Sequence, residues 1–240
     1  TRRQRQMCIR DRLNVEEIAV ISREYMNKVQ FLFAGGFIIA LAIQKWGLHK
    51  RVALNILKFS GLNSQGIVAS FMVASAVLSM WVMNTSTAIM LLPVGISVIK
   101  VINDTVSDIT DNQKFNFQLC LLLGIAYAAS VGGIATPIGT SPNGVLIQFA
   151  SNNYDYDIGF ANWISIGLPI TLGLGPIIWI FLTRIIFPVN FSATQESKEK
   201  LNSMLMELGP MSNEERKVIV VFLITAFFWI FRQLIDNLPG

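Results

Sequence analysis

The sequence predicts an all-α integral membrane protein that crosses the bilayer several times. Hydrophobic residues make up 52% of its 240 positions and charged residues 14%, whereas about a quarter of a soluble domain is charged. Mean hydropathy is +0.52. Several apolar runs without Asp or Glu reach or approach the ~20 residues that cross a ~30 Å hydrocarbon layer. These runs cover residues 29–44, 66–102, 117–150, 160–186 and 218–235.

The distribution of charge fits a membrane protein better than a nucleic-acid-binding protein. The formal net charge is +4, but the basic residues lie at the ends of apolar runs, as the positive-inside rule expects. We therefore expect the lipid bilayer, and no nucleic acid, as a partner. Cys8 and Cys120 are too few for a disulfide framework. His49 lies among three basic residues and is interpreted as a solvated, interfacial side chain without a catalytic role.

Residues 1–12 are interpreted as a non-native tail. They are very basic, lack the apolar core of a signal peptide, and resemble translated sequencing-adapter sequence. Residues 13–65 are expected to hold an interfacial segment, a first span at 29–44, and a basic amphipathic surface helix at 45–58 on the cytoplasmic side. Because the chain also stops just after an apolar run, we expect it to be a fragment.

Residues 66–102 form an apolar stretch that polar residues 83–87 interrupt. Its two arms, residues 66–82 and 88–102, are short for full spans. This favours a re-entrant hairpin over two complete spans. Both arrangements return the chain to the same side, so counting the spans does not decide between them.

Residues 117–150 contain more low-charge sequence than one span needs, which predicts a broken helix. Gly132-Gly133 and the segment 139–143 interrupt this run. The hairpin and the broken helix together make up residues 66–150. The expected remainder is an outer acidic loop and span at 151–187, a cytoplasmic loop at 188–217, and a last span within 218–240.

The two polar breaks indicate a binding site, because non-helical backbone at membrane depth survives only against protein or a wet cavity. Asn84 or Thr85 can cap a new helix, and so can Thr140 or Ser141 before Pro142. The first backbone amides of both helices could then converge on one anion. Small polar residues also serve packing, but two matched breaks favour the site. Discontinuous helices build such sites in secondary transporters.

Sodium is the coupling ion that the apolar runs favour. They lack the Asp or Glu that a proton-coupled carrier uses as a relay. Backbone carbonyls and oxygens of Ser79, Asn84 and Gly139 could instead hold a hard monovalent cation. We expect no cofactor and no enzyme chemistry, because the chain lacks HExxH and GxSxG motifs and an intramembrane Asp pair. The tryptophans Trp46, Trp81, Trp163 and Trp179 are interpreted as interface anchors or packing residues.

At these breaks the sequence resembles the divalent anion:sodium symporter family of dicarboxylate, citrate and sulfate carriers. The segments that carry the resemblance are LSMWVMNTSTAIMLLPV at 78–94, GIAYAASVGGIATPIGTSPN at 124–143, FLFAGGFIIALAIQKWGLHKRVAL at 31–54 and LGPMSNEERKVIVVFLITAFFWI at 208–230. The similarity covers nearly all of residues 13–240. It implies the first half of an inverted-repeat transporter, with residues 218–240 starting the second repeat. A homodimer in the cell inner (plasma) membrane is implied for the full-length protein.

The resemblance also implies a site. The family's Ser-Asn-Thr signature, at the tip of the hairpin, corresponds to Met83-Asn84-Thr85, so Met83 replaces a serine. The implied sodium ligands are Ser79, Met83 through its carbonyl, Asn84 and Gly139, and the implied substrate contacts are Asn84, Thr85 and Thr140. Residues 13–65 would belong to the dimer scaffold and residues 66–150 to the moving transport region.

The expected function is secondary active import of dicarboxylate-type anions coupled to sodium. Succinate, malate and fumarate, and also citrate or sulfate, fit recognition by helix ends, and the sequence does not choose among them or fix the sodium stoichiometry. A sodium-independent dicarboxylate exchanger on the same fold stays open, with Met83 as the sign of a vestigial ion site. Because the second half of the cradle is absent, this chain alone is expected not to transport.

Overall fold

The structure is a computed structural model that describes residues 28–236 except 59–60, 62 and 108. The predicted non-native tail and interfacial segment lie outside the described residues. The described part is helical, with one isolated bridge between Asn63 and Ser192, which confirms the all-α class. The chain divides after Gly35 into two compact units, and the contacts below lie within the second, Gly36–Gly240.

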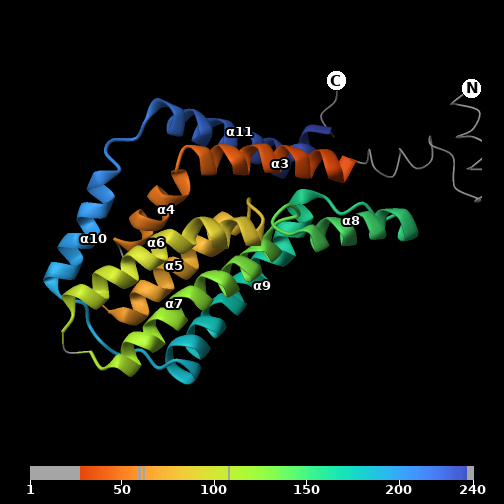
Figure 1. The fold of residues 1–240 in the computed structure, drawn as a ribbon. Helices are drawn as coiled ribbons and strands as arrows, with labels where there is room; N and C mark the ends of the chain where they lie inside the picture. Colours follow the sequence, from red (N-terminus) through yellow and green to blue (C-terminus); the bar gives the residue numbers. More distant parts are fainter. Residues whose placement is uncertain (1–27, 59–60, 62, 108, 237–240) are drawn as a thin grey trace, which may run out of the picture. The chain divides into compact units, whose positions relative to one another are not determined.

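The helices follow one another with short connections (Figure 1). They are α3 (Lys28–Lys45), α4 (Leu48–Leu57), α5 (Ser64–Ser79), α6 (Asn84–Thr105), α7 (Asp111–Gly132), the short 3₁₀ turn η1 (Gly133–Ala135), α8 (Ser141–Tyr154), α9 (Phe160–Ile180), the π-helical turn η2 (Phe181–Ile186), α10 (Gln195–Glu207) and α11 (Asn213–Asp236).

The core lies among α5, α6 and α7, which run side by side (Figure 1). Each of these helices is apolar on nearly every side, as expected for helices buried in protein or lipid. Their fully buried side chains include Phe71 from α5, Leu91 and Ile102 from α6, and Phe117 and Leu121 from α7. Both predicted interruptions survive as breaks between helices, one between α5 and α6 and one between α7 and α8.

The prediction for the second arm of the hairpin, residues 88–102, underestimates the length of the helix found there. Helix α6 has 22 residues, or about 33 Å at 1.5 Å per residue, because Asn84 to Thr87 already belong to its first turn. Among the described residues, three helical segments are long and apolar enough to cross a membrane, Asn84–Thr105, Asp111–Ala135 and Phe160–Ile186, and α5 is shorter. The argument for re-entry from short arms therefore fails for α6, and the re-entrant hairpin stays a prediction, as does the span in α11.

Helix α4 is the predicted basic surface helix, and it turns away from α3 by 70°. Gly47 makes this turn possible with a left-handed φ of 69°. The interpretation of His49 as a solvated side chain was wrong, because only 5% of it is exposed. His49, Ala53 and Leu57 are spaced by four along α4 and lie on its buried face, and α4 packs against α5, α6 and α10.

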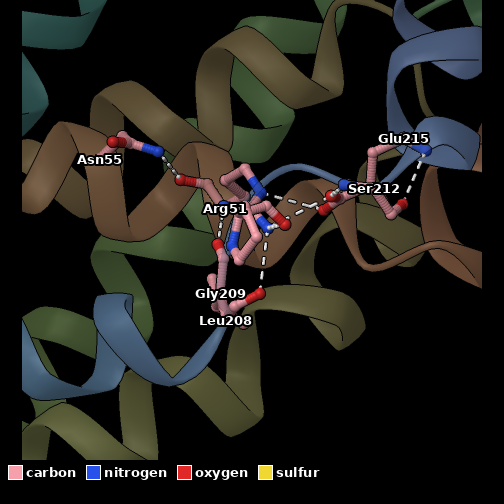
Figure 2. Close-up of polar contacts among 7 residues, drawn as sticks. Arg51, Asn55, Leu208, Gly209, Ser212 and Glu215 are labelled. Atoms are coloured by element: carbon pink, nitrogen blue, oxygen red, sulfur yellow. Dashed lines mark hydrogen bonds and ion pairs between the residues drawn. The ribbon is translucent and has the colours of Figure 1, made fainter.

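Arg51 joins α4 to the segment that connects α10 and α11 (Figure 2). Its Nε lies 3.0 Å and its Nη2 3.2 Å from the two carboxylate oxygens of Glu215 in the first turn of α11. It also donates to the carbonyls of Leu208 and Gly209. The side chains of Arg51 and Glu215 are only 12% and 8% exposed. The Arg51 guanidinium lowers the pKa of Glu215 below its ordinary value of 4.5, and the Ser212 N–H adds to this effect.

Replacing Arg51 by glutamine should destabilise the protein, since a nearly buried carboxylate then loses its partner. Breaking a buried pair in this way costs about 3–5 kcal/mol. We expect a lower midpoint of thermal denaturation in detergent, and partial recovery in the double variant Arg51→Met, Glu215→Leu. Because the pKa of Glu215 is lowered by folding, the pair's contribution is complete above pH 4.5 and is lost as pH falls further. An unchanged midpoint in Arg51→Gln would contradict this role.

Candidate ion and anion site

The two helix breaks meet in space although they are far apart in the sequence. Figure 1 shows the connected ends of α5 and α6 beside the turn between α7 and α8. The Thr136 hydroxyl, in the second break, donates to the carbonyl of Met80 in the first. The Cα of Gly139 lies against the Ser79 carbonyl, since an added Cβ would be 2.8 Å from that oxygen. The breaks therefore form one junction, which we call the break junction (residues 79–84 and 129–143).

Two glycines on the α7 side of the break junction allow a close approach, of backbone at Gly132 and of a side chain at Gly133. A Cβ on Gly132 would lie 2.4 Å from the carbonyl oxygen of Ala76 in α5. A Cβ on Gly133 would lie 2.2 Å from a terminal atom of the Asn84 amide. Real Cβ atoms do not approach other heavy atoms this closely. The Gly132-Gly133 pair that interrupts the apolar run thus lets α5 and the start of α6 reach the end of α7.

The side chain of Asn84 connects the two breaks. Two backbone carbonyls, of Ala129 and Gly139, lie 3.1 Å from one end of its amide, and the Ser79 hydroxyl oxygen lies 2.8 Å from the same end. Carbonyl oxygens only accept hydrogen bonds, so the amide nitrogen faces them. Asn84 is the first residue of α6, and Gly139 precedes the N-cap residue of α8. The starts of these two helices are therefore held together.

The break junction gathers the oxygen atoms that a hard cation prefers. Ser79 is fully buried, and its hydroxyl and carbonyl lie beside the carbonyls of Ala129 and Gly139. Such neutral oxygens can replace the hydration shell of a sodium ion. Within the described chain, no group of three or more His, Cys, Asp or Glu residues could hold a metal ion. Three of the four predicted ion ligands, Ser79, Asn84 and Gly139, therefore lie together, as the distances around the Asn84 amide and Gly139 show.

Met83, the fourth predicted ion ligand, is the N-cap residue of α6. Its carbonyl accepts the N–H of Thr87 at 2.9 Å, so one of the two lone pairs on that oxygen is used inside the helix. The prediction that Asn84 or Thr85 caps α6 was wrong, because both already lie in its first turn. Asn84 instead directs its side chain toward the carbonyl of Ala129 in α7 and that of Gly139 in the second break.

Neither helix start at the break junction has a side-chain cap. Thr140 is the N-cap residue of α8, as predicted, and a proline lies in the first turn, but the Thr140 hydroxyl does not close a capping bond. Thr85 is exposed and Thr140 half-buried, and neither hydroxyl makes a hydrogen bond within the part of the chain that the structure describes. The first-turn amides of α6 can therefore meet a ligand. The first turn of α8 offers fewer, because Pro142 has no N–H and the Asn143 N–H donates to the Thr140 carbonyl at 3.2 Å. The dipoles of both helices favour an anion.

Three further residues support the break junction, although the sequence analysis assigned none of them to the site. Asn143 is 7% exposed and donates to the carbonyls of Gly133 and Thr136, both at 2.8 Å. The Trp163 indole N–H, from α9, donates to the carbonyl of Ile134 at 2.9 Å. Trp163 is therefore a packing residue, one of the two interpretations given above. The available signal for Asn143 and Thr136 was a polar side chain inside a long apolar run.

These features define a class of protein. Helices long enough to cross a membrane carry two helix breaks that meet at a site of backbone carbonyls and helix N-termini without side-chain caps, as in secondary transporters. A model of the citrate transporter family matches residues 7–240, and the chain belongs to that family. It is a multi-pass membrane protein of a transporter family, which confirms the predicted carrier class.

Two curated relatives are named sodium-dependent dicarboxylate transporter SdcS. The chain is 37% identical over 224 residues to the protein of Staphylococcus saprophyticus, covering 93% of this chain and 43% of the relative. It is 36% identical over 216 residues to the protein of Staphylococcus aureus strain USA300, covering 90% of this chain and 42% of the relative. The chain thus spans less than half the length of these relatives.

Proposed function

We propose that the chain forms the first half of a plasma-membrane carrier that imports dicarboxylate-type anions together with sodium. The observation that carries this proposal is the Asn84 amide, which lies 3.1 Å from the Gly139 carbonyl and so holds the starts of α6 and α8 together. The names of the relatives support the sodium requirement and the dicarboxylate class.

In this proposal the break junction binds both the ion and one end of the anion. Ser79, Met83 and Gly139 supply oxygens to sodium, and Asn84 joins them when its amide turns over, so that its oxygen replaces the nitrogen that faces Ser79 and Gly139. Thr85, Thr140, Asn84 and the first-turn amides of α6 hold one carboxylate. A sodium ion beside this carboxylate offsets its charge, so each ligand raises the affinity for the other, and this mutual effect is the basis of coupling. The second carboxylate would meet the part of the carrier that corresponds to the uncovered length of the relatives.

The assembly of the carrier is part of the same proposal. Residues 13–65 would contribute to the scaffold of a homodimer, and residues 66–150 would form the region that moves with the substrate. The break junction lies wholly within residues 66–150, so the ion and the anion would move as one body. No cofactor is required for such coupling, because the sodium gradient supplies the driving force.

Uptake of labelled succinate tests the proposal. The full-length carrier, reconstituted in proteoliposomes, should accumulate succinate when sodium is higher outside. When sodium is equal on both sides, or when a potassium gradient replaces the sodium gradient, the succinate concentrations inside and outside should only become equal. Excess unlabelled malate, fumarate, citrate or sulfate would identify the preferred anion by competition. No accumulation under a sodium gradient by a correctly folded carrier would refute sodium symport.

Met83 favours a second candidate, a sodium-independent dicarboxylate exchanger on the same fold. Its side chain offers the ion no hydroxyl, and its carbonyl is partly engaged by Thr87. Counterflow separates the two candidates. Uptake that requires dicarboxylate inside the vesicles and ignores sodium would establish the exchanger.

A further inference from the structure

An apolar groove of about 450 Å³ lies between α5, α7 and α9, and one end of it reaches Met80 and Val131 of the break junction. Its walls run from Ala69 to Met80 on α5 and from Leu168 to Trp179 on α9. The lining carries almost no free polar atom. The hydroxyl of Thr171, for example, already donates to the carbonyl of Val131 at 2.9 Å. The groove therefore offers nothing to a polar ligand and suits a hydrocarbon chain.

The length of the groove matches one leaflet of a bilayer. Each wall covers eleven steps along a helix, or about 16 Å at 1.5 Å per residue, and half of a ~30 Å hydrocarbon core is about 15 Å. Helix α9 faces outward over most of its length, since only 11% of its apolar window is buried. A transmembrane helix is about 10 Å wide, so a 16 Å length of it would need far more volume than the groove provides.

A positive charge lies at one end of the groove. Trp179 closes this end, and its indole N–H donates to the carbonyl of Gln65 at 3.0 Å, which fixes the ring. The exposed guanidinium of Arg184 lies 5.9 Å from the centre of the same ring. A tryptophan and an arginine at the end of an apolar helix are typical of the membrane interface, and an arginine there attracts anionic lipid headgroups.

We propose that this groove binds one acyl chain of an anionic phospholipid, whose phosphate contacts Arg184. The lipid belongs to the leaflet on the Arg184 side, which is the cytoplasmic side by the positive-inside rule. The groove length, its apolar lining and the charge at its end fit one such lipid together. This inference rests on the membrane location of the chain and not on its transport function.

Glycines on α9 provide a matched pair of variants. A Cβ at Gly175, which lines the groove, would meet no atom within 4 Å, and the same holds for Gly173, which does not line it. Gly175→Leu should therefore fill the groove without disturbing the fold, and Gly173→Leu should change the same helix without filling it. Arg184→Gln removes the charge at the end of the groove, with the exposed Arg216→Gln as its control.

Native mass spectrometry of the full-length carrier tests the proposal, after equilibration with equal amounts of phosphatidylglycerol and phosphatidylcholine. The wild type, Gly173→Leu and Arg216→Gln should retain phosphatidylglycerol preferentially. Gly175→Leu should lose most of the retained lipid, and Arg184→Gln should bind both lipids equally. The proposal is overturned if Gly175→Leu retains as much lipid as the wild type. It is also overturned if the only effect of Gly175→Leu is a lower thermal stability in lipid-free detergent, because another part of the carrier then covers the groove.

Discussion

The Asn84→Ala carrier should lose sodium-driven succinate uptake almost completely. The substitution removes a proposed ligand of both the ion and the anion, and it takes the Asn84 amide away from the Gly139 carbonyl, whereas the Ala129 carbonyl keeps the Gly133 N–H as a donor. Leaving a buried polar group unpaired costs about 1–3 kcal/mol, or about tenfold in an equilibrium constant for each 1.4 kcal/mol. Initial rates of labelled succinate uptake in proteoliposomes, normalised to protein amount, measure the effect.

Two further variants show which property of Asn84 matters. Asn84→Asp keeps the shape but turns acceptor oxygens toward two carbonyls, so it should fail as completely as alanine. Asn153→Ala is the matched control, since Asn153 is exposed and its amide bonds only to the carbonyl one turn earlier in α8. It should transport like the wild type. Normal uptake by Asn84→Ala at normal expression would remove Asn84 from the site.

Gly139→Ala should abolish coupled uptake through the backbone rather than through a lost ligand side chain. The added Cβ would lie 2.5 Å from the carbonyl oxygen of Gly133 and 2.8 Å from that of Ser79. These neighbours are backbone atoms and cannot rotate away, so the break junction must open, at a cost of about 1–3 kcal/mol or more. We expect a loss of uptake of at least about tenfold and a higher sodium requirement for the uptake that remains.

Gly36→Ala is the control for this prediction. A Cβ at Gly36 in α3 would meet the side chain of Ile138 at 3.6 Å, an ordinary contact distance. Alanine in a helix interior is also more favourable than glycine by about 0.5–1 kcal/mol. This variant should transport like the wild type with equal or greater thermal stability. Equal activity of both glycine variants would show that the break junction tolerates expansion and would contradict the close packing described above.

Much of the fold could be predicted because hydropathy is a local property. The long apolar runs predicted helices α5 to α9, and the small polar residues within two of those runs predicted both breaks. The family motifs at 78–94 and 124–143 then identified Ser79, Asn84 and Gly139, which the structure brings together. Their roles toward sodium and substrate stay proposals that the variants above test.

Three expectations failed where the environment of a residue depends on distant parts of the chain. His49 is buried because α4 turns onto α5, α6 and α10, and no feature of the basic segment around it reports that packing. Asn84 does not cap α6, because the carbonyls of Ala129 and Gly139 compete for its amide. Helix α6 is therefore longer than expected, because it begins at Asn84, which was expected to cap the helix from outside its first turn.

The sequence by itself determined the all-α membrane class, the two helix breaks, the residue types at each helix start and the family. These follow from hydropathy, capping preferences and motifs, which are read within about twenty residues. Only the tertiary structure decided which atoms meet: the amide of Asn84 with α7, that of Asn143 across the second break, and Arg51 with Glu215 at a separation of 164 residues. Such contacts arise when helices pack, and each partner's local sequence is compatible with many other neighbours.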